Sequence, residues 1–481
     1  MLWLAVRLPH LALEIHARGT AAAAPLAIAE DSAGARLLLC DAMAHACGVR
    51  PGMTAASAWA LCTALRIMPR DLMAERRALE RVAAWACQFT SQVSLAGATE
   101  LLMEIGGSLR LFGGLEVLRN SLEHGLQQEL GYAAHLACAP TPLAAQWLAH
   151  AELPVSILHL DDLRHALHRI PTSSLQQLPG AAATLERFGI HTIGACLELP
   201  RDGLARRLGQ ELLDEIDRAL GNLPDPRPVF MPPRTFSSTL ALPAPTAQAE
   251  ALLFAARRLY AELCGYLAAT GQGAQRLEFT LHHECRRRTH FALDLVAASR
   301  DPVHLLMLLR ERLARLELPQ PAIAIRLACA QQQPLAAESR ALLPDARAQT
   351  EAVTRLIEKL RARLGNTAIC GLRLFADHRP EHAWRACPPE ESAAAREISV
   401  PGERPLWLLP QPQALREHGA VPHYDGPLTL LAGPERIESG WWDGHPVARD
   451  YFVARSPAHA VLWIYRERGA NARWFLQGIF S

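Results

Sequence analysis

Short apolar runs and helical patterns alternate over roughly residues 1–155. The opening run LWLAVRLP is apolar except for Arg7, which predicts a buried strand. The stretch PLAIAEDSAGARLLLCD predicts two further strands around turn residues, and segments 74–90 and 115–131 repeat apolar positions at helical spacing. Strands are expected again in ELLMEIGG and YAAHLACA. This order of elements predicts an α/β or α+β core.

The pattern changes after residue 165. Residues 165–225 predict short helices punctuated by glycines, and the prolines of DPRPVFMPPR predict a linker. Helical and strand patterns then alternate as far as Ala330, which predicts a small α+β domain. The segment EAVTRLIEKLRARLG predicts a helix that ends at Gly365 and carries its apolar residues on one face. These apolar residues are Val353, Leu356, Ile357, Leu360 and Leu364.

Residues 366–481 predict a β-rich region that is dense in tryptophan. The stretch AVLWIYRERGANARWFLQGIF predicts a hairpin that turns at 469–471. Trp463 and Trp474 on this hairpin suit a small core. Side chains alternate along a strand, so at least one of the adjacent residues Trp441 and Trp442 is expected to be exposed unless another segment covers it.

Length and composition indicate a multidomain globular protein. The chain has 481 residues, of which 50% are hydrophobic and 20% charged, so it can bury several cores. It has no run of about 18 apolar residues that would cross a membrane. Its 11 cysteines form no CxxC pair, which indicates reduced thiols in a cytoplasmic protein. We therefore expect no membrane span, disulfide framework or signal peptide.

Two further features bear on chemistry. Lys359 is the single lysine, which excludes a Schiff base or a P-loop lysine elsewhere, whereas arginine still serves to bind phosphate. The segment LHHECRRRTH groups His282, His283 and His290 with one glutamate and one cysteine. Adjacent histidines point to opposite faces of a strand, so we expect no metal site there.

Three stretches in this order resemble Y-family translesion DNA polymerases: CDAMAHACGVRPGM in the fingers, ELLMEIGGSLRLFGG in the palm and LPGAAATLERFGIHTIGACLEL in the thumb. The tail stretches GPERIESGWWDGHPVARDYFVA and ARWFLQGIF resemble the extension of the Y-family-like member of a bacterial mutagenesis cassette. The resemblance implies an α+β multidomain fold, with a Y-family DNA polymerase-like palm, fingers, thumb and little finger and a β-rich C-terminal extension. The implied domains are a palm at 1–24 and 70–164, fingers at 25–69, a helix-hairpin-helix thumb at 165–225, a little finger at 235–330, a connector and helix at 331–365, and the extension at 366–481.

The resemblance also indicates which residues align with the family's metal site, and these residues are unsuited to bind metal. Two-metal phosphoryl transfer needs carboxylates that bridge two cations. In Y-family enzymes these come from an aspartate on the first strand and an Asp-Glu pair, which here align with Arg7, Thr99 and Glu100. One carboxylate cannot hold two divalent ions, and Arg7 would add a positive charge. We expect Arg7 to pair with Glu100, and we expect no catalytic residue, metal or cofactor.

The nucleotide pocket also departs from the family's pattern. Ala42 and His45 stand where the family has a tyrosine and an arginine that hold the triphosphate, and the palm lysine aligns near Ala145. Another acid, such as Glu14 or Asp41, could replace the missing carboxylates. The leading hypothesis is a catalytically inactive, DNA-binding scaffold in damage-induced translesion synthesis. The alternative is an active lesion-bypass polymerase with an altered metal site.

DNA binding needs none of these carboxylates. The turns at Gly180 and Gly189 are expected to offer backbone N–H groups and helix N-termini to phosphates without reading sequence. The little finger adds arginines that can neutralise phosphates, although the three consecutive ones could equally form a solvated edge strand. These arginines are Arg276, Arg286, Arg287 and Arg288.

The resemblance implies partners besides DNA: a sliding clamp, a RecA-like cassette protein and an error-prone replicative-type DNA polymerase. Bacterial clamp ligands are short extended peptides with a leading glutamine, and the segment after Ala330 carries Gln332, Pro334 and Leu335. Pro334 favours an extended backbone there. The competing segment RPLWLLPQ at 404–411 has better apolar residues but no leading glutamine. No membrane partner is expected, and the resemblance implies a cytoplasmic, nucleoid-associated protein.

Overall fold

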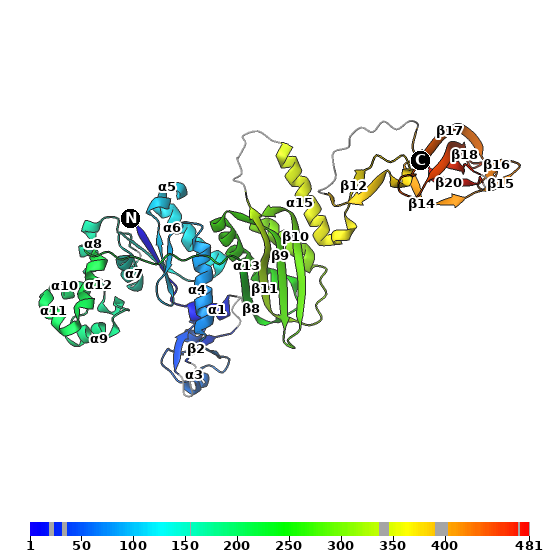
Figure 1. The fold of residues 1–481 in the computed structure, drawn as a ribbon. Helices are drawn as coiled ribbons and strands as arrows, with labels where there is room; N and C mark the ends of the chain where they lie inside the picture. Colours follow the sequence, from blue (N-terminus) through cyan, green and yellow to red (C-terminus); the bar gives the residue numbers. More distant parts are fainter. Residues whose placement is uncertain are drawn as a thin grey trace. The chain divides into compact units, whose positions relative to one another are not determined.

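The computed structural model divides the chain into two compact units, Met1–Arg363 and Leu364–Ser481. The first unit contains the elements that the resemblance assigns to palm, fingers, thumb and little finger (Figure 1). The structure describes residues 1–18, 24–30, 36–153, 155–335, 346–389, 403–469 and 472–480.

A four-stranded antiparallel sheet in the order β5-β6-β1-β7 forms the palm-like region. The central strand β1 (Trp3–Arg7) buries side chains on both faces, as its continuous apolar run predicts. Leu4 and Val6 face one core, and Ala5 faces the other. The remaining strands are β5 (Val93–Leu95), β6 (Glu100–Glu104) and β7 (His135–Ala139).

Helices cover both faces of this sheet. Helix α7 (Pro142–His150) packs on the face of Ala5, and α4 (Leu72–Ala86) packs on the face of Leu4. The palm-like region is therefore a sheet buried on both sides, which leaves mainly its strand ends for polar groups. The other helical segments here are α1 (Leu11–Ala17), η1 (Gly106–Ser108), α5 (Leu109–Phe112), α6 (Leu115–His124) and the π-helix η2 (Gly125–Leu130).

A small sheet in the order β3-β2-β4 forms the fingers-like region. Its central strand pairs antiparallel with β3 and parallel with β4. Asp41 begins helix α2, because one carboxylate oxygen accepts a hydrogen bond from Ala44 N (2.7 Å) and the other accepts from Leu26 N (3.0 Å). The elements are β2 (Leu26–Ala29), β3 (Leu37–Cys40), α2 (Ala42–Ala46), α3 (Ala55–Leu61) and β4 (Arg66–Pro69).

Short helices form the thumb-like region, as the glycine-punctuated pattern predicts. Their apolar residues, such as Leu163 and Ile216, join the core on the α7 side of the palm sheet. The proline-rich linker follows, and Phe230 N donates a hydrogen bond to Val93 O (2.6 Å) at the edge of that sheet. The elements are α8 (Leu160–Leu167), η3 (Thr172–Ser174), α9 (Pro179–Arg187), α10 (Ile193–Leu197), α11 (Arg201–Leu208) and α12 (Gln210–Leu220).

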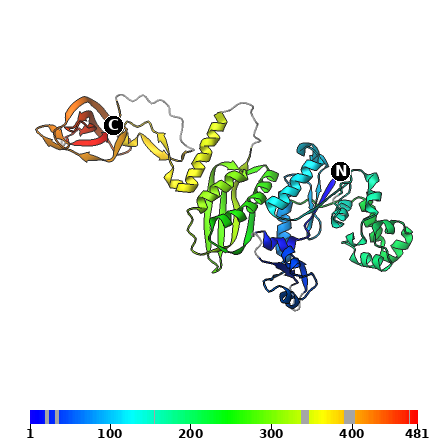
Figure 2. The ribbon, with the colours of Figure 1, turned by 180° about the vertical axis from the view of Figure 1, so that it is seen from behind.

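The little-finger-like region is a four-stranded antiparallel sheet in the order β10-β9-β11-β8. Helices lie on one of its faces, as Figure 2 shows from behind, and the buried residues of the strands alternate accordingly. The opposite face carries polar side chains. The elements are β8 (Ser237–Thr246), α13 (Ala249–Thr270), β9 (Gln272–His283), β10 (Arg288–Ser299), α14 (Pro302–Leu313) and β11 (Ala322–Pro334).

The last strand of this sheet is longer than the sequence predicts. Strand β11 does not end at Ala330 but continues to Pro334, which lies opposite Gln272 of β9. Glutamines can extend the ladder because strand pairing uses backbone groups, whatever side chains are attached. Residues 336–345 lie outside the described residues, and α15 (Ala346–Leu364) follows them.

Helix α13 packs against palm helix α4, and a buried ion pair also links α13 to the palm-like region. Arg18 Nη2 lies 2.6 Å from Glu262 Oε1, and both side chains are at most 3% exposed. Arg18 Nη1 also donates to the Tyr132 hydroxyl (2.6 Å). Gly265 lies so close to the Trp85 ring that a Cβ atom there would be 2.2 Å from Trp85 Cδ1. The contact therefore requires glycine at this position of α13.

The second unit is β-rich, as predicted, and its sheet has the order β14-β20-β19-β18-β17. Trp463 and Trp474 are 2% and 5% exposed and lie in two separate cores. The predicted hairpin joins β19 to β20, and turn residues 470 and 471 lie outside the described residues. The sheet strands are β14 (Trp407–Ala414), β17 (Thr429–Ser439), β18 (Val447–Arg455), β19 (Val461–Glu467) and β20 (Trp474–Ile479).

Trp441 and Trp442 lie in the turn between β17 and β18, so strand alternation does not apply and both are exposed, by 79% and 57%. The buried Arg379 holds this turn, because its Nη2 donates to Asp443 Oδ2 (2.6 Å). No helix in the described part of the chain is long and apolar enough to span a membrane. The smaller elements of this unit are η4 (Asn366–Ala368), β12 (Gly371–Leu374), η5 (Pro380–His382), β13 (Trp384–Cys387), β15 (Arg416–His418) and β16 (Val421–His423).

Glu14 of α1, near the contact between α13 and the palm-like region, makes the stability of the chain depend on pH. Burial raises the pKa of Glu14 to about 7, and the hydrogen bond from Ala133 N only partly opposes this effect. The folded state therefore holds a proton between about pH 4.5 and 7 that the unfolded state releases, so stability falls as the pH rises through this window. We expect Glu14→Gln to stabilise the chain by about 2–3 kcal/mol near pH 8 and by less than about 1 kcal/mol near pH 5. Thermal unfolding at the two pH values measures this, and an equal effect at both would contradict it.

Candidate functional site

A row of polar side chains crosses the end of the palm sheet. Arg7 of β1 lies opposite Glu100 of β6 and opposite His135 of β7. Alternation along β1 puts Arg7 on the same face as Ala5, which is the face that α7 covers. Two residues of α7, Gln146 and His150, reach the same carboxylate. The residues that align with the family's metal site are therefore brought together.

Glu100 is only 5% exposed and has protein partners on both carboxylate oxygens. Gln146 Nε2 donates to Oε2 (2.7 Å), and His150 Nε2 contacts Oε1. The Arg7 Nε atom lies 3.9 Å from Oε1, so the expected proximity of Arg7 and Glu100 is confirmed. A buried carboxylate needs such partners, because an unpaired buried charge is costly.

Arg7 is itself held in place by residues beyond the sheet. Its Nη1 atom lies 3.3 Å from the His150 carbonyl oxygen, to which it donates, and 3.4 Å from Glu152 Oε1. Thr99 supplies no carboxylate, and its backbone oxygen accepts a hydrogen bond from Leu8 N (2.8 Å). Among the residues that the structure describes, no three His, Cys, Asp or Glu side chains are grouped so as to hold a metal ion.

Two acids that could have replaced the missing carboxylates have structural roles. Asp41 caps α2, as described above, and Glu14 accepts a hydrogen bond from Ala133 N (2.7 Å). Glu104, four residues after Glu100 on β6, accepts hydrogen bonds from Leu2 N and Gly106 N (both 3.1 Å). Each carboxylate satisfies backbone donors at the end of an element, so none of them completes a metal site around Glu100.

The residues aligned with the nucleotide pocket lie in two different environments. Ala42 and His45 are exposed on the short helix α2 of the fingers-like region. Ala145, near which the palm lysine aligns, is fully buried in the core on the α7 side of the palm sheet. The neighbouring Gln146 faces Glu100 instead, because a shift of one residue turns a helical position by about 100°.

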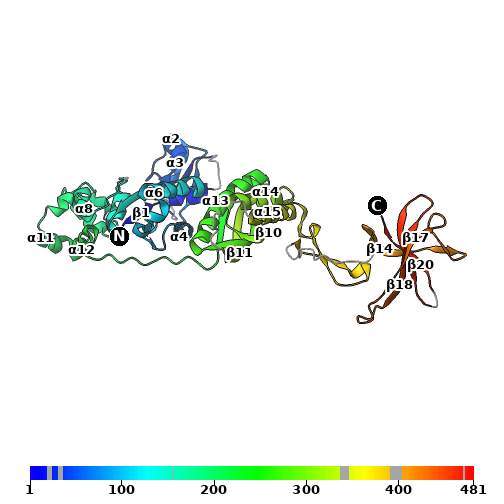
Figure 3. The same ribbon diagram turned by 90° about the horizontal axis from the view of Figure 1, so that it is seen from above.

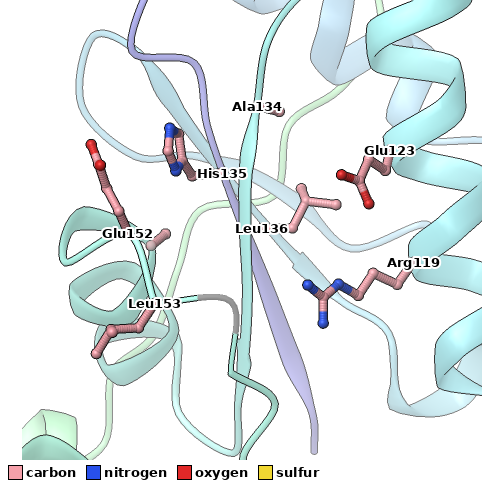
Figure 4. Close-up of a pocket in the computed structure, with 8 residues that line it drawn as sticks. Arg119, Glu123, Ala134, His135, Leu136, Glu152 and Leu153 are labelled. Carbon is pink, nitrogen blue, oxygen red and sulfur yellow. The ribbon is translucent and has the colours of Figure 1, made fainter.

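A small cavity of about 160 Å³ lies beside this cluster, at strand β7 (Figure 4). Figure 4 shows His135 and Glu152 on one side of the strand and Arg119 and Glu123 of α6 on the other. Pockets that take small-molecule ligands usually measure about 300 Å³ or more. The cavity is thus too small to enclose a nucleotide.

The two thumb glycines differ in what their backbone can offer. Gly180 is exposed in the first turn of α9, where helix N–H groups have no partner within the helix. Gly189 has a φ of +74° and ends the same helix. Its N–H donates to Glu186 O (3.0 Å), and the next N–H, of Ile190, donates to Leu185 O (2.9 Å). The expectation that the Gly189 turn offers N–H groups to phosphate is therefore wrong, because helix capping uses them.

The consecutive arginines of the little finger are exposed at the tip of a hairpin. Arg286 and Arg287 lie in the turn between β9 and β10, and Arg288 begins the edge strand β10. Arg276 lies further along the sheet, where its Nη1 donates to Asp294 Oδ1 (2.8 Å). The charge of Arg276 is thus partly compensated.

Sequence reasoning missed Arg326 beside the hairpin on the open face of the sheet, and it considered His282 and His290 only as metal ligands. His282, His290 and Arg326 project from neighbouring strands near Arg288. Burial lowers the pKa of His282, and the nearby charges of Arg288 and Arg326 lower it further. The alternation of side chains along the predicted strands indicates which residues share a face of the sheet. It does not give the strand order that brings these residues together.

The adjacent histidines of the histidine-rich segment point to opposite faces of β9, as expected. His283 is buried, and its ring nitrogens lie 3.1 Å from Pro321 O and 2.9 Å from Thr289 Oγ1. His282 lies on the opposite face of β9. The adjacent histidines therefore do not converge on one ligand.

Comparisons with known proteins found similar sequences. Residues 13–150 match the model of the impB/mucB/samB family. Protein ImuB of Caulobacter vibrioides is 29% identical over 461 residues, which cover 90% of this chain and 100% of that protein. The chain is similar to ImuB over most of its length. The segment that matches the impB/mucB/samB model lies in the α+β first unit, and the β-rich unit follows.

More distant matches cover less of the chain. DNA polymerase IV of Enterobacter sp. is 26% identical over 167 residues, which are 34% of this chain and 46% of that protein. DNA polymerase IV of Moorella thermoacetica is 28% identical, with 34% and 41% covered. Among solved structures, DinB from Sulfolobus solfataricus is 15% identical with a TM-score of 0.39, covering 68% of this chain and 98% of that one.

Glu100 and Glu152 both lie near Arg7, one buried and one exposed, so substitution of each in turn tests the buried cluster. We expect Glu100→Ala to destabilise the first unit by about 2–4 kcal/mol, because Arg7 and His150 lose the buried group that compensates them. Glu152→Ala removes an exposed partner of the same guanidinium and should cost less than about 1 kcal/mol. Thermal unfolding of the two variants compares them, and equal shifts would contradict a special role for Glu100.

Proposed function

We propose that this ImuB-like chain is a catalytically inactive, DNA-binding scaffold in damage-induced translesion synthesis. The observation that carries this proposal is the enclosure of Glu100 by Arg7, Gln146 and His150. Protein groups occupy the positions around this carboxylate that two cations would need for phosphoryl transfer. The guanidinium of Arg7 adds repulsion toward any cation that approaches Glu100.

A primer-extension assay tests the inactivity directly. With a primed template, nucleotides and either Mg²⁺ or Mn²⁺, the purified chain should add no nucleotide, because one compensated carboxylate cannot organise two metal ions. An active Y-family polymerase run in parallel shows that the assay works. Extension that persists after Glu100→Gln would point to a contaminating enzyme. Extension abolished by Glu100→Gln would overturn the proposal in favour of an active polymerase with an altered metal site.

DNA binding would rest on groups away from Glu100. Gly180 presents the N-terminus of α9, and the hairpin arginines Arg286 to Arg288 project from the little finger with Arg326 beside them. Backbone donors and arginines contact phosphates without reading the base sequence. The expected ligand is therefore DNA of any sequence, and the expected location is the cytoplasm, on the nucleoid.

The salt dependence of DNA binding tests the hairpin. Replacing Arg286, Arg287 and Arg288 together by alanine should weaken binding about tenfold or more and lower the slope of log affinity against log salt by about 2–3, because fewer counterions are released. Arg276→Ala is the matched control and should change the slope by less than 1, since Asp294 already pairs with Arg276. Fluorescence anisotropy at several salt concentrations measures both, and an unchanged slope in the triple variant would make the hairpin an ordinary solvated turn.

Protein partners belong to the same proposal. The resemblance implies a sliding clamp, a RecA-like cassette protein and an error-prone replicative-type DNA polymerase, which would supply the synthesis. The second unit suits recruitment because it presents exposed aromatic side chains, such as Trp441 and Trp442, and such residues are enriched in binding hot spots.

The two candidate clamp segments differ in accessibility. Gln332 and Pro334 belong to the paired strand β11, and Gln332 Nε2 donates to Arg234 O (3.0 Å). A clamp could take up this segment only after the strand end had separated. Leu406 and Trp407 are instead 87% and 69% exposed at the start of the edge strand β14. The structure thus favours the segment that the sequence ranked second.

Clamp binding by two double variants decides between these segments. Leu406→Ala with Trp407→Ala should lower clamp affinity at least tenfold, because a short peptide ligand depends on a few apolar anchors. Gln332→Ala with Leu335→Ala should leave the affinity within about twofold. Surface plasmon resonance with immobilised clamp gives both values. The opposite ranking would return the clamp site to Gln332, Pro334 and Leu335.

A further inference from the structure

A cavity of about 680 Å³ lies within the second unit, between the β12–β13 hairpin and the five-stranded sheet. Residues of β14 and β17, which Figure 3 shows in that sheet, line the cavity opposite the hairpin. Pockets that take small-molecule ligands usually measure about 300–1000 Å³. The cavity is therefore large enough to accept a planar group such as a nucleobase.

Hydrogen-bonded ion pairs hold the end of the hairpin against the sheet. Arg379 Nη2 donates to Asp443 Oδ2 (2.6 Å) in the turn that follows β17. Arg449 Nη1 of β18 donates to Glu381 Oε1 (2.8 Å). Gln477 Nε2 of β20 donates to the other oxygen of Glu381 (2.8 Å). The walls of the cavity are thus fixed within the second unit, so a ligand does not have to order them.

Aromatic side chains give the cavity flat apolar surfaces. Phe375 and Trp384 of the hairpin line it and are 37% and 46% exposed, and the buried Trp463 lines it from the sheet. Arg404 lies over the Trp463 ring, with 4.9 Å between its Cζ atom and the ring centre, and pairs with Glu435. The lining therefore combines aromatic faces with hydrogen-bonding groups whose charges are already compensated.

Two arginines beside the cavity have no carboxylate to compensate them. Arg373 and Arg385 lie directly opposite each other in the hairpin, and both are exposed. Neither guanidinium forms an ion pair within the part of the chain that the structure describes. Like charges directly opposite each other on paired strands repel, which is unfavourable. An anionic ligand would relieve this repulsion.

Phe375 connects the two arginines with the cavity. Alternation directs Arg373 and Arg385 to one face of the hairpin and Trp384 to the other. Phe375 follows the last residue of β12 and adjoins both sides, because it lines the cavity and lies under both guanidinium groups. The Cζ atoms of Arg373 and Arg385 are 5.9 and 4.8 Å from the centre of its ring. An extended ligand that crosses the hairpin end could therefore place charges at the arginines and a planar group in the cavity.

Single-stranded DNA complements both features. Its phosphates pair with arginines, and its unstacked bases expose flat faces that stack on aromatic side chains. Neighbouring bases cover those faces in a duplex, so a duplex could use the arginines alone. An acidic peptide would also pair with the arginines, but an apolar anchor would shield Arg404 and Glu435 from water without offering them hydrogen bonds. The edge of a base offers both donors and acceptors.

We propose that Arg373, Arg385, Phe375 and Trp384, together with the adjoining cavity, form a binding site for single-stranded DNA. The arginines contact phosphates, and one base enters the cavity. This site goes beyond the function proposed above, which places DNA contact in the first unit, and it does not depend on whether the chain is an active polymerase. The choice of DNA over RNA rests on that proposed function, because stacking would serve either.

The salt dependence of single-strand binding tests the arginines. The probes are an oligothymidylate of about 12 nucleotides and a duplex of about 12 base pairs, measured by fluorescence anisotropy on the full chain. Arg373→Ala with Arg385→Ala should weaken oligothymidylate binding about tenfold and lower the slope of log affinity against log salt by about 1.4, because two phosphate contacts are lost. Duplex affinity should stay within about twofold. Arg416→Ala with Arg455→Ala, which changes two other exposed arginines of this unit, is the control and should leave both unchanged.

Binding through the first unit is reduced by repeating these measurements in a chain whose Arg286, Arg287 and Arg288 are alanine. The loss caused by the Arg373 and Arg385 substitutions should persist there, because the two sites share no residue. Duplex binding by the triple variant tests the function proposed above, whereas the difference between single strand and duplex tests the site in the second unit. Failure of one proposal is therefore distinguishable from failure of the other.

Substitution of Trp384 tests stacking separately from charge. Trp384→Ala should weaken oligothymidylate binding several-fold without changing the salt slope, because it removes a stacking surface but no cation. Trp384→Phe keeps an aromatic face and should restore most of the affinity. Trp441→Ala changes another exposed tryptophan of the same unit and is the control. Thermal unfolding of each variant shows whether the second unit remains folded.

Four results would overturn the proposal. Unchanged oligothymidylate affinity in the Arg373 and Arg385 double variant would remove the hairpin from consideration. Equal losses for single strand and duplex would make the arginines general phosphate contacts. Tighter binding of oligouridylate than of oligothymidylate would assign the site to RNA. Displacement of the oligothymidylate by a polyglutamate peptide of equal charge would assign the arginines to an acidic protein.

Discussion

The negative charge of a carboxylate buried at the end of a covered sheet must be compensated. The function proposed for this chain depends on which groups compensate Glu100. Metal ions could compensate it, but here a guanidinium, an imidazole and an amide do so. The same contacts enclose both oxygens of the carboxylate. Arg7 contributes in two ways, because it supplies a partner for Glu100 and a positive charge that opposes cations.

Buried acids also join the little finger to its surroundings. Glu262 of α13 pairs with Arg18 beside the palm, and Glu358 of α15 bonds two backbone N–H groups of β10. Each acid has partners on both oxygens, which is the condition under which a buried charge is tolerated. Arginine suits the cationic side of such pairs, because its planar group offers several donors and it keeps its charge when buried. The near absence of lysine from the chain is consistent with this use of arginine.

Sequence reasoning predicted the elements better than the contacts between them. The strands that carry Arg7 and Glu100 follow from apolar runs, and their pairing follows from the resemblance. Gln146 and His150 could not be foreseen, because α7 reaches Glu100 only when the chain folds over the sheet. Amphipathicity located the apolar face of α15 but not its exposure, because a pattern cannot show that Glu358 finds backbone partners on the opposite side. The end of β11 was not predicted, because its residues are polar, whereas strand pairing uses hydrogen bonds of the backbone.

The features on which the proposed function rests lie in separate parts of the fold. The Glu100 cluster lies beneath α7, whereas the hairpin arginines lie at the end of a different sheet. Contributions of sites that share no partners are approximately independent, so the pairing at Glu100 need carry no cost for the exposed arginines of the hairpin. If the proposed function is correct, one set of contacts stabilises the palm and prevents metal binding, while the little finger keeps exposed cations that a stability argument alone would not require.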